Sequence, residues 1–160
     1  MQRITPCLWF GGNAEEAVAF YIEIFPDSKV RDTLYYDKAS SQAAGMPEGS
    51  VLTITFELDG QAFMALNGQP DYQFTEALSL SVSCDSQAEV DHYWGRLCDG
   101  GEEIACGWLK DRYGLSWQVV PKRLPELLAD PDPKVSAGAM KAMLKMKKID
   151  IAELERAAGL

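Results

Sequence analysis

The sequence has 160 residues, of which 47% are hydrophobic and 24% charged, a balance typical of a globular protein with its own buried core. Its net charge of −9 argues against a nucleic-acid partner and against binding to anionic membranes, because both require a basic surface. The apolar runs are too short to cross a bilayer, and no secretory signal is visible at Met1–Ile4. We therefore expect a cytoplasmic protein with no membrane partner.

The four cysteines are spaced singly along the chain, without the close pairs that zinc sites and redox motifs require. We interpret them as small hydrophobic side chains kept reduced in the cytoplasm. They are Cys7, Cys84, Cys98 and Cys106.

The first part of the sequence predicts a strand, a helix and three further strands. Asn13 and Glu16 form a capping-box pattern, after which apolar residues recur at helical spacing until Phe25–Pro26. Asp59–Gly60 is a hairpin signal between two alternating segments. The expected strands are 4–10, 28–36, 51–58 and 61–66.

Asp37–Ser50 separates the second and third of these strands and is rich in serine, alanine and glycine. We expect a loop there. Its length is more typical of a lid or a binding loop than of a simple connection.

The pattern then repeats. Ser86 and Glu89 form a second capping box, and the helix that they begin ends at Gly100–Gly101. A shift of about 72 residues aligns the caps and apolar faces of the two helices, which predicts two related modules. Strands are expected at 78–84, 103–109 and 115–120, the last two flanking a turn at 110–114.

Residues 123–160 predict a helical tail. Asp132 and Pro133 are suited to begin one helix, and Asp150 with Glu153 to begin a last short one. The methionine-rich side from Ala139 to Met146 is an adaptable packing surface, onto either this chain or a partner subunit. The expected division of the chain is 1–70, 71–122 and 123–160.

Four motifs carry a family resemblance: Phe10–Ala17 followed by Phe20–Tyr21, Gly107–Pro121, Asp130–Pro133 and Ala142–Asp150. They resemble the PhnB-like branch of the glyoxalase/bleomycin resistance (vicinal oxygen chelate) superfamily, whose members often carry the label 3-demethylubiquinone-9 3-methyltransferase. The resemblance covers nearly the whole chain, and Gly107–Pro121 is its most specific part. It implies an α+β fold of two βαβββ modules, each a curved sheet half-wrapping a cleft, usually completed in a homodimer.

In metal-using relatives, the resemblance implies four ligands, one on the first and one on the last strand of each module. The matching places hold side chains that do not ligate a hard divalent ion, namely Pro6 or Cys7, Met64 or Ala65, Ala77 or Leu78, and Gln118. The single histidine, His92, is expected at the edge of the apolar face of the second helix. We therefore expect neither a metal nor a cofactor.

The methyltransferase label has little support from the residues. Gly11–Gly12 before a helix is a weak pattern for binding S-adenosylmethionine, and the repeated crossovers of a parallel sheet are missing. No activating base is evident for Cys7 or Cys106 as a nucleophile. Asp111 and Arg112 are interpreted as residues of a tight turn.

What remains in the cleft is aromatic and mildly polar. Because only alternate strand residues face one side, Gln118 and Trp117 should point in opposite directions. We expect a metal-free protein that binds a small uncharged aromatic or amphipathic ligand between its modules, as a homodimer. The alternatives are an enzyme in the same cleft, either a methyltransferase or a glyoxalase- or dioxygenase-like lyase, and a structural dimer with a vestigial pocket. The candidate ligand-binding residues are Cys7, Trp9, Met64, Asn67, Cys106, Trp108 and Gln118.

Overall fold

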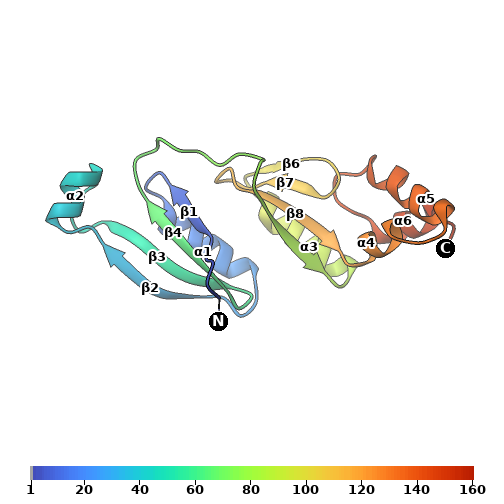
Figure 1. The fold of residues 1–160 in the computed structure, drawn as a ribbon, viewed down its shortest axis with the longest axis horizontal. Coiled ribbons are helices and arrows are strands. Elements are labelled where there is room, and N and C mark those ends of the chain that lie inside the picture. The colour runs from blue at the N-terminus through green and yellow to red at the C-terminus, as the bar shows by residue number, and fades with distance from the viewer. Residues whose placement is uncertain (1) are drawn as a thin grey trace. The chain divides into compact units, whose positions relative to one another are not determined.

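A computed structural model describes residues 2–160 (Figure 1). The contacts within the chain divide it into two compact units, Met1–Gln73 (unit 1) and Phe74–Leu160 (unit 2). Each unit is built around one four-stranded sheet, and the tail helices belong to unit 2. The predicted α+β fold with a helical C-terminal region is therefore confirmed.

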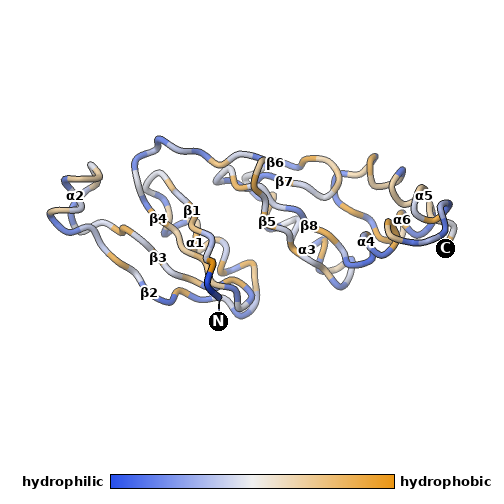
Figure 2. The backbone as a smooth tube through the Cα atoms, viewed as in Figure 1, coloured by the Kyte–Doolittle hydropathy of each residue, from blue (hydrophilic) through white to orange (hydrophobic). Residues whose placement is uncertain are grey.

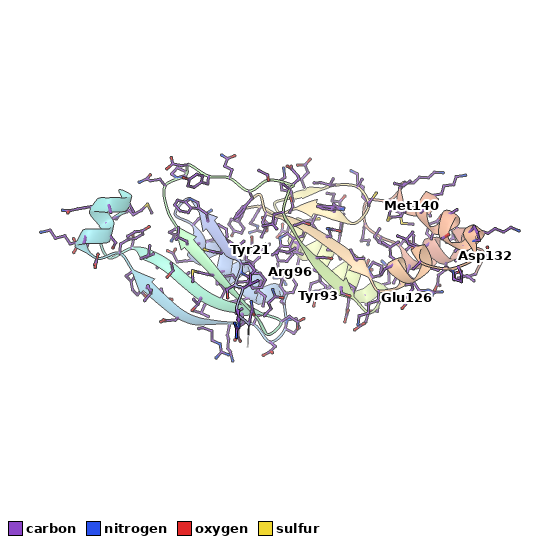
Figure 3. All side chains as sticks on the ribbon, in the orientation of Figure 1. Tyr21, Tyr93, Arg96, Glu126, Asp132 and Met140 are labelled. Atoms are coloured by element: carbon purple, nitrogen blue, oxygen red, sulfur yellow. The ribbon has the colours of Figure 1, made fainter. Side chains whose placement is uncertain are left out.

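Unit 1 has strand order β1-β4-β3-β2, with β1 and β4 parallel and the other pairs antiparallel. Helix α1 covers one face of this sheet, where its Tyr21 side chain is fully buried (Figure 3). The elements are β1 (Cys7–Phe10), α1 (Ala14–Ile24), β2 (Lys29–Tyr35), α2 (Lys38–Ala44), β3 (Val51–Leu58) and β4 (Gln61–Asn67).

Unit 2 repeats this topology, with strand order β5-β8-β7-β6 and a parallel pair formed by β5 and β8. Helix α3 covers one face, and three helices follow β8. The elements are β5 (Ser79–Cys84), α3 (Gln87–Cys98), β6 (Glu102–Glu103), β7 (Trp108–Lys110), β8 (Ser116–Pro121), α4 (Arg123–Leu128), α5 (Pro133–Met143) and α6 (Ile151–Ala157).

The repeat is real, but its predicted register is wrong by one residue in the helices. Helix α1 begins at Ala14 and α3 begins at Gln87, which is a shift of 87 − 14 = 73. That shift superimposes buried Tyr21 on buried Trp94. A shift of 72 would instead pair Tyr21 with Tyr93, a match of residue type, whereas burial depends on the helical phase set by the start of each helix.

The first predicted helix cap is also wrong. Among residues 2–160, no side-chain capping bond links Asn13 to α1. The N–H of Ala14 instead donates to Asn67 Oδ1 at 2.8 Å, so the cap comes from the end of β4. The second predicted cap is confirmed, because Ser86 Oγ accepts the N–H of Glu89.

The expected loop at 37–50 contains helix α2, which projects beyond the sheet of unit 1 (Figure 1). Asp37 accepts the N–H of Ser40 at 2.8 Å and Ser40 Oγ accepts the N–H of Asp37, a full capping box. Gly45 ends the helix in the left-handed region, at φ 69°. The short helix has no buried residue, so no hydrophobic pattern revealed it.

The expected strand at 103–109 is broken into β6 and β7 by a turn. Cys106 and Gly107 both have positive φ, at 59° and 83°. Their N–H groups donate to Met146 O and Lys147 O, each at 2.8 Å, rather than to a neighbouring strand. A contact with residues 40 positions away decides this break, and local sequence did not signal it.

The tail helices form their own small core. The hydropathy colouring marks hydrophobic stretches in α5 and α6 (Figure 2). Asp132 and Asp150 cap α5 and α6 as predicted. Met143 and Met146 pack on this core, whereas Met140 lies on the outside of α5 (Figure 3). Within residues 2–160, no helix is both long and apolar enough to span a bilayer.

Candidate functional site

The sheet of unit 1 has a core face against α1 and an opposite face, which we call open face 1. Leu8 and Phe10 are buried on the core face, so alternation places Cys7 and Trp9 on open face 1. Cys7 is in register with Met64, and Trp9 with Leu66. On the other side of β4, Met64 pairs with Thr55 and Leu66 with Thr53. These residues of open face 1 therefore join a thiol, an indole, a thioether and hydroxyl groups into a neutral patch.

Trp9 is held rigidly on this face by the segment that follows β4. Its Nε1 donates to Gln69 O at 2.9 Å, and its ring meets the Tyr72 ring edge-on, with centroids 4.9 Å apart. A Cβ on Gly68 would lie 2.1 Å from the Trp9 ring, so only glycine allows the indole to lie this close to the backbone. The indole is thus fixed before any ligand arrives.

The sheet of unit 2 has the same arrangement, with α3 on its core face and an open face 2 opposite. Trp117 is buried on the core face, where its Nε1 donates to Asp111 Oδ2 at 2.8 Å. Gln118 therefore lies on open face 2, which confirms the expected alternation. It is in register with Ser81 on β5 and Trp108 on β7, and its Nε2 donates to Ser79 Oγ at 3.0 Å.

Two of the predicted site residues lie elsewhere. Asn67 is on the core face of unit 1, 2% exposed, and its side chain bonds to Ala14, Glu15 and Val51. Cys106 lies in the turn between β6 and β7, next to the tail, and not on a strand. A polar residue at the end of a strand suggested a ligand site, whereas in the structure the Asn67 amide bonds to the first residues of α1 and to Val51.

The metal-ligand positions can be compared directly with the strand registers. The parallel pairs place Cys7 beside Met64 and Ser81 beside Gln118. The positions expected from sequence at Ala77 or Leu78 are wrong, since both residues precede β5. A thiol, a thioether, a hydroxyl and an amide do not fit a hard divalent ion, which prefers carboxylate or imidazole ligands. Residues 2–160 also contain no group of three or more His, Cys, Asp or Glu side chains arranged to hold a metal.

Comparison with known proteins gives the family. The sequence model described as 3-demethylubiquinone-9 3-methyltransferase matches residues 2–120. This chain belongs to that family. A PhnB protein from Bacillus cereus that carries the same methyltransferase description is 35% identical, with 75% of this chain and 99% of that chain covered and a TM-score of 0.67. A search of curated proteins gives no match.

Two more distant structures share the fold alone. Protein PA1353 from Pseudomonas aeruginosa is 23% identical over 76% of this chain and 98% of that chain, with a TM-score of 0.60. The fosfomycin resistance protein FosX from Listeria monocytogenes is 16% identical over 79% of this chain and 97% of that chain, with a TM-score of 0.53. The family model and the PhnB protein confirm the predicted PhnB-like family, and these two structures confirm the predicted glyoxalase/bleomycin-resistance-like fold.

In this member of the 3-demethylubiquinone-9 3-methyltransferase family, the serines of open face 2 were missed from sequence. Ser79, Ser81 and Ser83 alternate along β5, with a period of two that places all three on the side opposite buried Cys84. Ser116 on β8 is in register with Ser79. The alternating serines were a usable signal, because a strand with one polar side presents that side to solvent or to a ligand.

We predict that Cys7 is not an activated nucleophile. Burial raises the pKa of its thiol, so the thiolate is scarcer at neutral pH than in a free cysteine. Iodoacetamide should therefore alkylate Cys7 no faster than it alkylates glutathione near neutral pH, measured by peptide mass spectrometry. The matched reference is the same peptide in unfolded protein. A native rate about tenfold above glutathione would instead support covalent catalysis.

Proposed function

We propose that this chain is a metal-independent protein that binds a small, uncharged aromatic or amphipathic molecule on the open faces of its sheets. The observation that carries the proposal is the neutral donor set at the paired strand positions, Cys7 with Met64 and Ser81 with Gln118. A charged ligand placed there would lose hydration without gaining a paired charge. An apolar ring would gain about 25 cal/mol for each Å² of surface removed from water.

Trp9 and Trp108 support this proposal. Both indoles are half-buried on open faces. Trp9 is in register with Leu66, and Trp108 is in register with the neutral amide of Gln118. Binding sites for small molecules combine such apolar walls with a few fixed polar groups. Trp9 is also immobilised by Gln69 and Tyr72, which lowers the entropic cost of binding a ring against it.

The activity in the family description is the second candidate. Enzymes that transfer a methyl group from S-adenosylmethionine commonly have a doubly wound parallel sheet. Each sheet of this chain instead has one parallel pair of strands and otherwise antiparallel pairs. Gly12 has φ 98°, which suits a turn between β1 and α1. We therefore favour binding over catalysis.

We predict that the purified protein contains no stoichiometric zinc, nickel, iron or manganese and that EDTA leaves its melting temperature unchanged. Elemental analysis and differential scanning fluorimetry test this. A metabolite screen by thermal shift then tests the function. Uncharged aromatic compounds should stabilise the protein without added metal. If stabilisation comes only from anionic chelators together with a metal, the proposal is wrong.

We also propose a cytoplasmic homodimer. All four cysteines are unpaired thiols, as in a reducing compartment. On α5 and just after it, Met140 and Leu144 are 40% and 63% exposed, an apolar stripe suited to a partner subunit.

Light scattering should give about twice the monomer mass of 17.7 kDa. Leu144→Glu should shift the protein toward monomer, whereas Leu160→Glu, at an equally exposed site near the C-terminus, should not. A monomeric wild-type protein at micromolar concentration would rule the dimer out.

A further inference from the structure

Ser116 is a buried hydroxyl without a hydrogen-bond partner. The residue is 0% exposed, and its Oγ makes no hydrogen bond with any of residues 2–160. Buried polar groups are nearly always hydrogen-bonded, because an unpaired group loses its hydrogen bonds to water and gains none inside the protein. An orphaned hydroxyl on the face of a proposed site therefore requires a reason.

The position of Ser116 on open face 2 explains why its hydroxyl is left unpaired. Its neighbours in register on open face 2 are Ser79 on β5 and Lys110 on β7, and Gln118 is the next residue along β8 on that face. Gln118 Nε2 donates to Ser79 Oγ, which leaves Gln118 Oε1 and the Ser79 O–H without a partner among residues 2–160. Three polar groups with unused hydrogen-bonding capacity thus meet on the adjacent parallel strands β5 and β8.

We propose that Ser79, Ser116 and Gln118 form a hydrogen-bonding subsite for a carbonyl or hydroxyl oxygen on an uncharged aromatic ligand. The Ser116 hydroxyl donates to this oxygen, and the ring of the ligand lies toward Trp108, which is in register with Gln118. The inference rests on the proposed function and names the ligand chemistry that open face 2 selects.

Lys110 controls access to the subsite. It flanks Ser116, and its Nζ pairs with Glu76 Oε1 at 2.5 Å, with the two side chains 32% and 61% exposed. Such exposed ion pairs contribute little to stability, so the lysine side chain can swing away at small cost. Once the lysine has moved, the ligand oxygen can reach the Ser116 hydroxyl, which is closed to solvent while the ion pair is in place.

The first test needs no ligand. Because Ser116→Ala removes an unsatisfied group, it should raise the melting temperature of dialysed protein by about 2–4 °C. Ser83→Ala, on the exposed end of the same serine row, should leave it unchanged. A melting temperature lowered by Ser116→Ala, or left unchanged, would show that the hydroxyl is satisfied inside the fold and would overturn the subsite.

The second test uses acetophenone and ethylbenzene, which differ by one carbonyl oxygen. Titrations followed through the backbone amide signals of Ser79, Ser116 and Gln118 should show acetophenone binding wild-type protein more tightly than ethylbenzene. Ser116→Ala should weaken acetophenone binding about tenfold and leave ethylbenzene binding unchanged. Equal losses for both compounds, or no loss, would contradict the role of Ser116. If neither compound binds wild-type protein, the proposed function is wrong for open face 2. The melting temperature of Ser116→Ala still shows whether the Ser116 hydroxyl is hydrogen-bonded inside the fold.

Discussion

Replacing Asp111 by alanine should destabilise the protein more than any other single change that we predict, by about 4 kcal/mol. The carboxylate is 3% exposed, and Oδ1 accepts the N–H groups of Tyr113 and Leu115 at 2.8 and 3.1 Å. Oδ2 accepts Trp117 Nε1 at 2.8 Å. Alanine leaves these three donors without the carboxylate in a buried turn, and each unpaired buried donor costs about 1–3 kcal/mol.

Urea denaturation followed by tryptophan fluorescence measures this loss. Asp99→Ala is the matched control, because Asp99 also carries a charge near this turn but is exposed, and its ion pair with Arg112 is worth at most about 1 kcal/mol. The Trp117 indole N–H signal should move in the Asp111 variant and stay in place in the control. A loss below about 1 kcal/mol for Asp111→Ala would mean that water replaces the carboxylate.

The parts of the fold that were predictable are those with local physical causes. In β3, Ile54, Phe56 and Leu58 alternate with partly exposed residues, and a buried face on one side of a strand requires this pattern. Asp59 and Gly60 have φ of 49° and 75°, the left-handed pair that a tight hairpin needs. Asp111 was assigned to a turn for the same kind of reason, although the burial of its carboxylate was not foreseen.

The parts that were missed depend on contacts between distant segments. The turn at Cys106–Gly107 exists because the tail provides Met146 O and Lys147 O as acceptors. The cap of α1 comes from Asn67, 53 residues after Ala14. Local pattern can indicate that a polar residue ends a strand, but it cannot tell whether that residue faces a ligand or a helix end.

The candidate site was predictable in the same limited sense. Alternation predicted that Gln118 and Trp117 point in opposite directions. The registers then place Met64 beside Cys7 and Trp108 beside Gln118. The polar character of open face 2 was not foreseen. The alternation of serines along β5 was visible in sequence, but only the parallel pairing of β5 with β8 brings Ser79 beside Ser116.

Replacing Asn67 by alanine should cost about 3 kcal/mol and leave open face 1 chemically unchanged. Asn67 Oδ1 accepts Ala14 N–H at 2.8 Å, and Nδ2 donates to Glu15 Oε1 and Val51 O. Its backbone carbonyl accepts the buried Tyr36 hydroxyl, so β4, α1 and the chain on either side of α2 meet at this residue. Alanine removes the helix cap, leaves a buried N–H and a carbonyl unpaired, and opens a cavity.

The control is Asn13→Ala, because Asn13 occupies the cap position by sequence but its side chain makes no capping bond to α1 within the described chain. It should cost less than about 0.5 kcal/mol. Equal losses of unfolding free energy for the two variants would indicate that Asn13 caps α1 after all. Binding of uncharged aromatic compounds should survive Asn67→Ala at temperatures where the variant is folded, since its side chain lies on the core face. A variant that keeps its stability but loses such binding would instead place Asn67 in the ligand site.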